Sequence, residues 1–308
     1  MRSPPASLVP LLAVTGLVIN ALNYGLIWWP LRYLQGWGLH PMWATVMVDA
    51  LACAGIFVLF PRIWRVFLTH RWLWLLAVAA GGTNVGFSWG VVVSDVVRVT
   101  LLTYLMPAWV VLLAWPILGE KPNAGAIARL ALALGGMVVV LKTPESPWPV
   151  PESFADVLGL LGGLSFAMVN IMLRKLRDAP PVANALAMFG GGGLGCLVAA
   201  LVGMQFGIVQ AVPPVATEWV IGVLLLTVAI IIANSTLQYG ASRLPANTTS
   251  IIMLLEVVFA SVSSVYWGAG LLTANTLIGG ALIFAACVWS ALSSAPPIAS
   301  DAPLAPPQ

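Results

Sequence analysis

Five asparagines occur inside long apolar segments, where polar side chains are uncommon. They are Asn20, Asn23, Asn84, Asn170 and Asn234. Gln238 lies one helical turn after Asn234 and would share its helix face. A buried amide needs a hydrogen-bond partner, which is either a neighbouring helix or a polar molecule inside the protein. The amides therefore indicate either helix pairing or a polar cavity, and the sequence leaves both alternatives open.

Two carboxylates, Asp49 and Glu256, also lie near the middle of apolar segments. Ionisable groups at such depth are functional candidates by default, because placing them in a membrane is costly. Either residue could carry a coupling proton, and the alternative for each is a hydrogen bond to a neighbouring helix. No basic residue occurs at a similar depth as an obvious ion-pair partner.

Pro107 lies inside the apolar segment 97–118 and predicts a bend, because proline lacks the backbone N–H and clashes with the preceding turn. Thr100 and Tyr104 would share one face just before that bend. The matching positions 150 residues later include Ser250, and Glu256 is matched with Met106. Polar groups at matched depths predict a shared binding site near the membrane midplane.

The sequence predicts no catalytic residue, metal site or cofactor. Cys53, Cys196 and Cys287 each lie inside an apolar segment without CxxC spacing, which predicts small buried hydrophobic side chains. The segments between apolar runs contain no DxD, HxxE or GxSxG pattern that would indicate an enzyme acting on lipid-linked substrates.

Composition identifies the elements that must position these residues. Hydrophobic residues make up 60% of the 308 residues and charged residues only 7%, against about 25% in soluble domains. The chain is therefore an integral membrane protein with the lipid bilayer as its partner, and it has no basic stripe for nucleic acid. Apolar segments of about 20 residues predict ten transmembrane helices in an all-α fold. They are 8–30, 42–60, 72–93, 97–118, 124–141, 154–173, 182–203, 218–239, 247–267 and 273–292.

Glycines recur at helical spacing in two of these segments. Gly82, Gly86 and Gly90 are four residues apart, and Gly190–Gly193 form a continuous run followed by Gly195. Such stripes predict close helix packing, with a helix that bends during gating as the alternative.

A shift of 150 residues aligns the chain with itself. It places Asn20 on Asn170, Pro30 on Pro180, Asn84 on Asn234 and Gly90 on Gly240. This offset predicts two repeats, residues 1–141 and 154–294, joined by a proline-rich linker at 142–153. The proline-rich tail at 295–308 is predicted to be disordered.

Basic residues near the helix ends predict the orientation. One side holds ten of them, Arg2, Arg62, Arg65, Arg71, Lys121, Arg129, Arg174, Lys175, Arg177 and Arg243. The other side holds Arg32, Arg98 and Lys142. Both termini are therefore predicted to be cytoplasmic, and five spans per repeat make the arrangement a 5+5 inverted-topology repeat, a design found in transporters.

The segment Tyr104-Leu105-Met106-Pro107-Ala108-Trp109, followed by Leu118-Gly119-Glu120-Lys121, resembles the end of the first repeat in the drug/metabolite transporter superfamily, EamA type. The Tyr-Leu-x-Pro run is also similar to the aromatic amino-acid exporter branch. In the second repeat, Val257 follows Leu254-Leu255-Glu256 where the family has proline, and Ala269-Gly270 replaces the closing Gly-Glu. The sequence thus leaves open whether the second repeat bends as the first does.

The resemblance implies a secondary-active or facilitative transporter in the inner (cytoplasmic) membrane that exports small metabolites, amino acids foremost, by alternating access. Another substrate class, such as a drug, nucleoside or sugar derivative, is the alternative, with a membrane-embedded enzyme on lipid-linked substrates behind it. The predicted cavity lining is Asn20, Asn23, Asn84, Thr100, Tyr104, Asn170, Asn234, Gln238 and Ser250. Pro107 is the predicted bend, and Glu256 and Asp49 are the candidates for proton coupling. The sequence leaves the substrate, the coupling ion and the oligomeric state open.

Overall fold

The computed structural model describes residues 8–93, 102–141, 153–267 and 273–293. These residues form helices and contain no strand. Seven of the helices are long and apolar enough to cross a membrane, and two shorter apolar helices cover Met106–Leu118 and Ala124–Val140. Thr100, the linker up to residue 152 and the tail 295–308 lie outside the described residues. The all-helical architecture is confirmed, while ten spans in two inverted halves stay a prediction.

The helices of the first half follow the predicted segments, with a turn inside the first segment, a later start of α7 and the short additional helix α4. They are α1 (Val9–Leu26), α2 (Trp28–Gly36), α3 (Pro41–Leu59), α4 (Ile63–Thr69), α5 (Arg71–Val93), α7 (Met106–Leu118) and α8 (Ala124–Leu141). The predicted segment 8–30 overlaps one candidate span, Val9–Gly36, which a single turn residue, Ile27, divides into α1 and α2. Pro30 explains the break, since it cannot donate to the carbonyl four residues earlier.

The second half repeats this series of helices. It contains α9 (Phe154–Lys175), α10 (Pro181–Gln205), α11 (Thr217–Ala241), α12 (Ala246–Met253), α13 (Leu255–Tyr266) and α14 (Ala274–Ser293). A capping box starts α9, in which Ser153 and Asp156 exchange hydrogen bonds with each other's backbone N–H groups.

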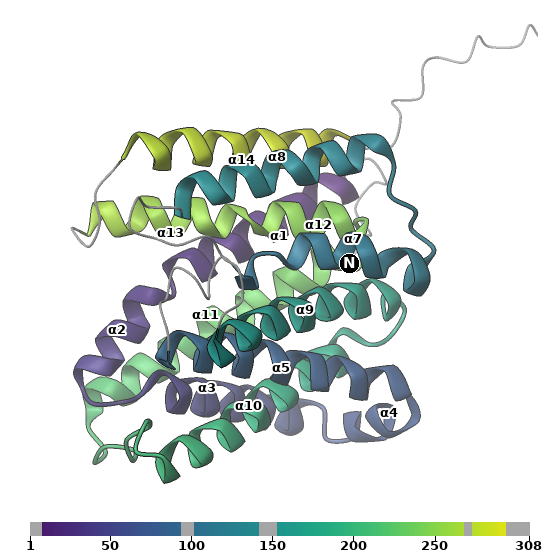
Figure 1. Cartoon of the computed structure of the whole chain (residues 1–308). Coiled ribbons are helices and arrows are strands. Elements are labelled where there is room, and N and C mark those ends of the chain that lie inside the picture. Colours follow the sequence, from purple (N-terminus) through teal and green to yellow (C-terminus); the bar gives the residue numbers. More distant parts are fainter. Residues whose placement is uncertain (1–7, 94–101, 142–152, 268–272, 294–308) are drawn as a thin grey trace, which may run out of the picture.

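Helices of the two halves pack mainly against each other. Figure 1 shows α8 beside α14 at one edge of the bundle and α3 beside α10 at the opposite edge. Between these edges, α1 packs against α11 and α13, and α9 packs against α5 and α7. A 150-residue shift converts each of these contacts into another contact of the same set. The two halves therefore interleave, and the core lies between them.

The chain breaks at equivalent places in both halves. Tyr104 and Leu105 form a turn before α7, so Pro107 stands in the first helical turn, where its missing N–H needs no partner. Leu254 interrupts the second half between α12 and α13 without a proline. Both breaks are tightened turns with i→i+3 hydrogen bonds, from Leu105 N–H to Leu102 O (3.3 Å) and from Leu254 N–H to Ile251 O (3.1 Å). The second half thus breaks as the first does, although its motif lacks the proline.

Glycines bring α5 into backbone contact with a helix on each side. A Cβ on Gly86 would lie 2.7 Å from the Cα and the N of Gly162 in α9. A Cβ on Gly81 would lie 2.8 Å from the carbonyl oxygen of Gly191 in α10. These glycines therefore allow close helix packing in the described structure, as the sequence predicts.

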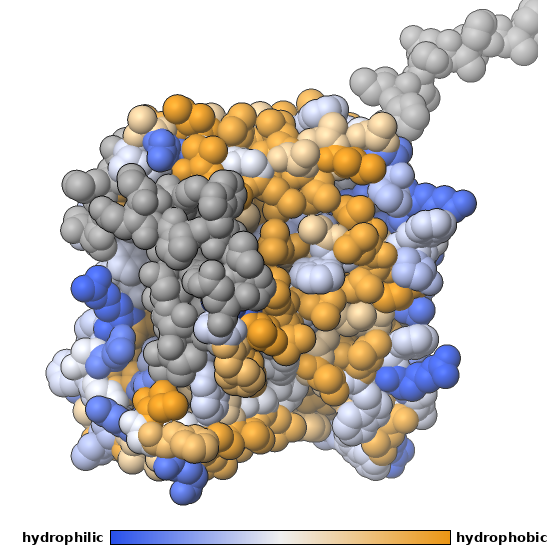
Figure 2. Space-filling view, in the orientation of Figure 1, coloured by the Kyte–Doolittle hydropathy of each residue, from blue (hydrophilic) through white to orange (hydrophobic). Residues whose placement is uncertain are grey.

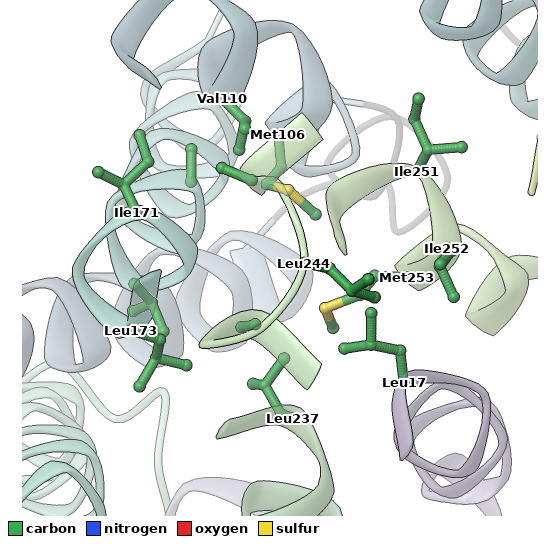
Figure 3. Packing of buried hydrophobic residues seen from close by; sticks show 14 of the residues in the cluster. Leu17, Met106, Val110, Ile171, Leu173, Leu237, Leu244, Ile251, Ile252 and Met253 are labelled. Atoms are coloured by element: carbon green, nitrogen blue, oxygen red, sulfur yellow. The ribbon is translucent and has the colours of Figure 1, made fainter. Parts of the chain in front are cut away.

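The main apolar core draws side chains from both halves. Figure 3 shows Leu17 of α1 and Met106 of α7 near Leu237 of α11 and Met253 of α12, all of them buried. The outer surface is also apolar: Val58 keeps 80% and Phe206 72% of its side chain exposed. Figure 2 shows hydrophobic residues across the middle of one face and hydrophilic ones at its left and right margins, the distribution that a bilayer requires.

Candidate functional site

Asp49 and Asn84 meet over a glycine of α10. Asp49 on α3 is 5% exposed, and Asn84 on α5 is half-buried. A Cβ on Gly192 would lie 2.6 Å from Asn84 Nδ2 and 2.7 Å from Asp49 Oδ2. The two polar groups therefore occupy space that a side chain on α10 would otherwise fill. Gly192 was singled out in the sequence only as part of a packing stripe, so its place in the polar site was missed.

The amide pair of α11 approaches the same face of α10 one turn earlier. Gln238 Nε2 donates to Asn234 Oδ1, and Asn234 Nδ2 donates to Met188 Sδ at 3.6 Å. Met188 and Gly192 are four residues apart and so lie on one face of α10. Asp49, Asn84 and the Asn234–Gln238 pair thus lie beside neighbouring turns of α10.

Other predicted lining residues bond neighbouring helices or their own helix. Asn20 on α1 is fully buried, and its Nδ2 donates to Ala233 O of α11 at 2.8 Å. Asn170 on α9 donates to Phe166 O at 3.0 Å and approaches Met106 Sδ at 3.7 Å. Ser250 is fully buried and donates to Asn247 O of its own helix at 3.0 Å. Asn23 is half-buried on α1. The helix-pairing alternative therefore accounts for the nitrogen of Asn20.

Tyr104 and Glu256, which the sequence placed on matched segments of the two halves, meet directly. The Tyr104 hydroxyl donates a hydrogen bond to the Glu256 carboxylate. Both side chains are half-buried although they lie between the halves. The bond joins the turn before α7 to the first turn of α13, so the two chain breaks supply the two partners.

Tyr24 links this pair to Asp49 and was missed as a site residue. It lies on α1, is half-buried, and is within electrostatic range of both Asp49 and Glu256. The sequence signal was an isolated tyrosine close to Asn20 and Asn23, which is equally typical of a membrane-interface anchor. Tyr24 on α1 thus lies within electrostatic range of carboxyl groups on both α3 and α13.

The model of the EamA-like transporter family matches residues 7–142 and 153–292. The chain belongs to the EamA-like transporter family. Membership makes it a multi-pass membrane protein and indicates a transporter rather than an enzyme.

Two individual proteins are also similar to this EamA-like chain. An uncharacterized transporter of Archaeoglobus fulgidus is 26% identical over 192 residues, which cover 62% of this chain and 66% of that relative. A solved crystal structure, 18% identical, covers 94% of this chain and 99% of its own with a TM-score of 0.71. The second similarity shows a shared fold.

A polar tie joins the two halves of this EamA-like protein after α7. Glu120, just after α7, accepts from Arg174 Nε of α9 at 3.2 Å and from the backbone N–H of Ala246, the first residue of α12, at 2.9 Å. Arg174 also donates to Ser242 O at 3.0 Å. Glu120 and Arg174 keep only 23% and 21% of their side chains exposed. The closing Glu of the family motif therefore joins the first half to the second.

Glu120→Ala is expected to destabilise this EamA-like protein by about 2 kcal/mol, because a charged hydrogen-bond acceptor with two donors is lost. For a chain of this size that corresponds to a fall of about 5 °C in the melting temperature in detergent. Asp178→Ala is the control, since its pair with Arg177 is exposed on both sides and such pairs contribute little. Equal melting temperatures for Glu120→Ala and Asp178→Ala would contradict a stabilising tie.

Proposed function

We propose that this chain is a carrier of the cytoplasmic membrane, with both termini cytoplasmic, that exports small metabolites, amino acids foremost, by alternating access. The proposal rests mainly on one observation. Polar side chains from three other helices lie beside neighbouring turns of α10, namely Asp49 of α3, Asn84 of α5 and the Asn234–Gln238 pair of α11. Polar groups gathered in a membrane interior are costly unless they serve a solute or ion pathway.

The interleaved packing supports an inverted 5+5 repeat. The family model matches once in each half, and the contacts of α1 with α11 and α13 correspond to those of α9 with α5 and α7. In carriers built in this way, the solute binds where the repeats meet and the halves exchange roles as the protein opens to either side. The chain breaks at Leu105 and Leu254 provide the points at which this movement is proposed to occur.

Proton coupling is proposed to use Glu256. Its carboxylate is held by Tyr104 at the junction of the halves, where a change in their arrangement would alter the hydrogen bond. A small solute moving with or against a proton would then be a secondary-active substrate.

Asn84→Ala and Asn234→Ala are expected to lower the transport rate at least about tenfold in proteoliposomes, the effect of losing about 1.4 kcal/mol of binding. Uptake and efflux of a panel of labelled amino acids, with nucleosides and drugs as competitors, is the measurement. Asn275→Ala is the matched control, because Asn275 is exposed at the start of α14. Transport rates of Asn84→Ala and Asn234→Ala that lie within about twofold of the Asn275→Ala rate would argue against the amide site.

A further inference from the structure

Asp49 is a buried carboxyl group with an oxygen that has no hydrogen-bond partner in the described structure. Its side chain is 5% exposed, its Oδ2 has no hydrogen-bond partner, and it makes no ion pair with a residue in the described ranges. Glu256, in contrast, accepts from Tyr104. A buried charge without a partner is strongly unfavourable, so Asp49 requires a positive group or a proton that the surrounding helices do not provide.

Two buried amides on helices of the same bundle also have acceptors without partners. Asn20 and Gln238 belong to α1 and α11, which pack against each other, and α11 packs against α3, the helix of Asp49. Their nitrogens donate to Ala233 O and to Asn234 Oδ1, while Asn20 Oδ1 and Gln238 Oε1 have no partner. Exchanging O and N in Asn20 would place two oxygens face to face, so its free atom is the acceptor. The buried oxygens of Asn20, Asp49 and Gln238 that have no partner therefore need hydrogen-bond donors.

Asp49 packs against glycines of α10 rather than against a side chain that could pair with it. A Cβ on Gly192 or Gly193 would lie 2.7 Å from Asp49 Oδ2 or 2.9 Å from its Cβ, so this face of α10 offers the carboxyl group no side-chain donor. Half-buried Asn84 lies against the same glycine as Asp49, and half-buried Tyr24 lies within electrostatic range of it. A tyrosine ring also attracts a cation over its face.

We infer that Asp49 binds the ammonium group of a protonated primary amine, and that the carboxylate of an amino acid is dispensable for binding. This inference rests on the proposed carrier function and specifies which part of the solute is recognised. An ammonium group supplies both the positive charge and three N–H donors. A solute carboxylate would bring more acceptor oxygens to a region whose free buried atoms are already acceptors, and no described basic side chain forms an ion pair with Asp49 or Glu256 there.

The test uses four probes with the same apolar body: 2-phenylethylamine, phenylalanine, 3-phenylpropanoate and 2-phenylethanol. Binding to the purified full-length protein is measured by calorimetry. The amine is expected to bind at least as tightly as phenylalanine, and 3-phenylpropanoate is expected not to bind. Tight binding of 3-phenylpropanoate, or of 2-phenylethanol equal to that of the amine, would overturn the inference.

Asp49→Asn keeps the shape of the side chain and removes its charge. It is expected to raise the Kd of 2-phenylethylamine at least about tenfold. Glu218→Gln is the matched control, because it removes an exposed carboxylate at the start of α11 and should leave the Kd unchanged. An unchanged Kd in folded Asp49→Asn would refute the assignment, and if that variant does not fold, the ranking of probes on the wild-type protein decides.

Transport in proteoliposomes separates this inference from the proposed function. If phenylalanine is carried but the amine neither binds nor competes, the ammonium assignment is wrong and the carrier function stands. If no amino acid or amine is carried although the amine binds through Asp49, the assignment stands and the carrier function is wrong.

Discussion

Gly191→Ala is expected to prevent normal packing of α5 against α10. A Cβ at Gly191 would overlap the backbone carbonyl of Ala77, and no rotation of a side chain can relieve an overlap with backbone. Overpacking of this kind costs about 1–3 kcal/mol, and more where the backbone must move. The variant should give a lower yield of monodisperse protein and a lower melting temperature, read by fluorescence-detected size exclusion and thermal denaturation in detergent.

The adjacent glycine provides the control. A Cβ at Gly190 would meet no atom within 4 Å, and alanine favours a helix over glycine by about 1 kcal/mol. Gly190→Ala should therefore be as stable as the wild type or more so. If the two variants behaved alike, the close contact between α5 and α10 would not hold.

Glu256→Gln is expected to abolish accumulation driven by a pH gradient while downhill exchange continues. Glutamine cannot take up and release a proton, yet its side-chain oxygen can still accept from the Tyr104 hydroxyl, so the junction between the turn before α7 and α13 is kept. The titratable groups facing Glu256 are Tyr104 and, within electrostatic range, Tyr24. The measurement is uptake against a concentration gradient in proteoliposomes with an imposed pH difference.

Tyr104→Phe serves as the comparison for this prediction. It removes the hydroxyl and leaves the carboxyl group able to titrate, so accumulation should persist. A Glu256→Gln protein that still concentrates its solute would exclude Glu256 as the proton carrier.

The helices and their boundaries could be predicted because hydrophobic length is a local property. Segments such as 124–141 coincide with the observed α8 (Ala124–Leu141). Pro107 likewise predicted an interruption of the helix near its position, because proline lacks the backbone N–H. The break at Leu254 had no such signal in the sequence, because i→i+3 turns can form without proline.

The site was predictable only in its residue types. Intramembrane Asp49, Asn84 and Glu256 stood out by polarity, but their partners depend on which helices cross. That Asp49 and Asn84 meet over Gly192, and that Tyr24 lies within range of both carboxylates, follows from contacts between halves far apart in sequence. Tyr24 and Gly192 carried no local signal beyond membrane anchoring and packing.

The tie formed by Glu120 and Arg174 has a consequence for the resting state of the proposed carrier. If the two halves had identical sequences, the inward-open and outward-open forms would have equal free energy and would be equally populated. Here the 150-residue shift places Gly270 opposite Glu120 and Tyr24 opposite Arg174, so the matched positions cannot form the same ion pair. Since each 1.4 kcal/mol shifts a two-state population about tenfold, any stabilisation by this tie that is lost when its end opens would shift the population of the proposed carrier toward the form closed there.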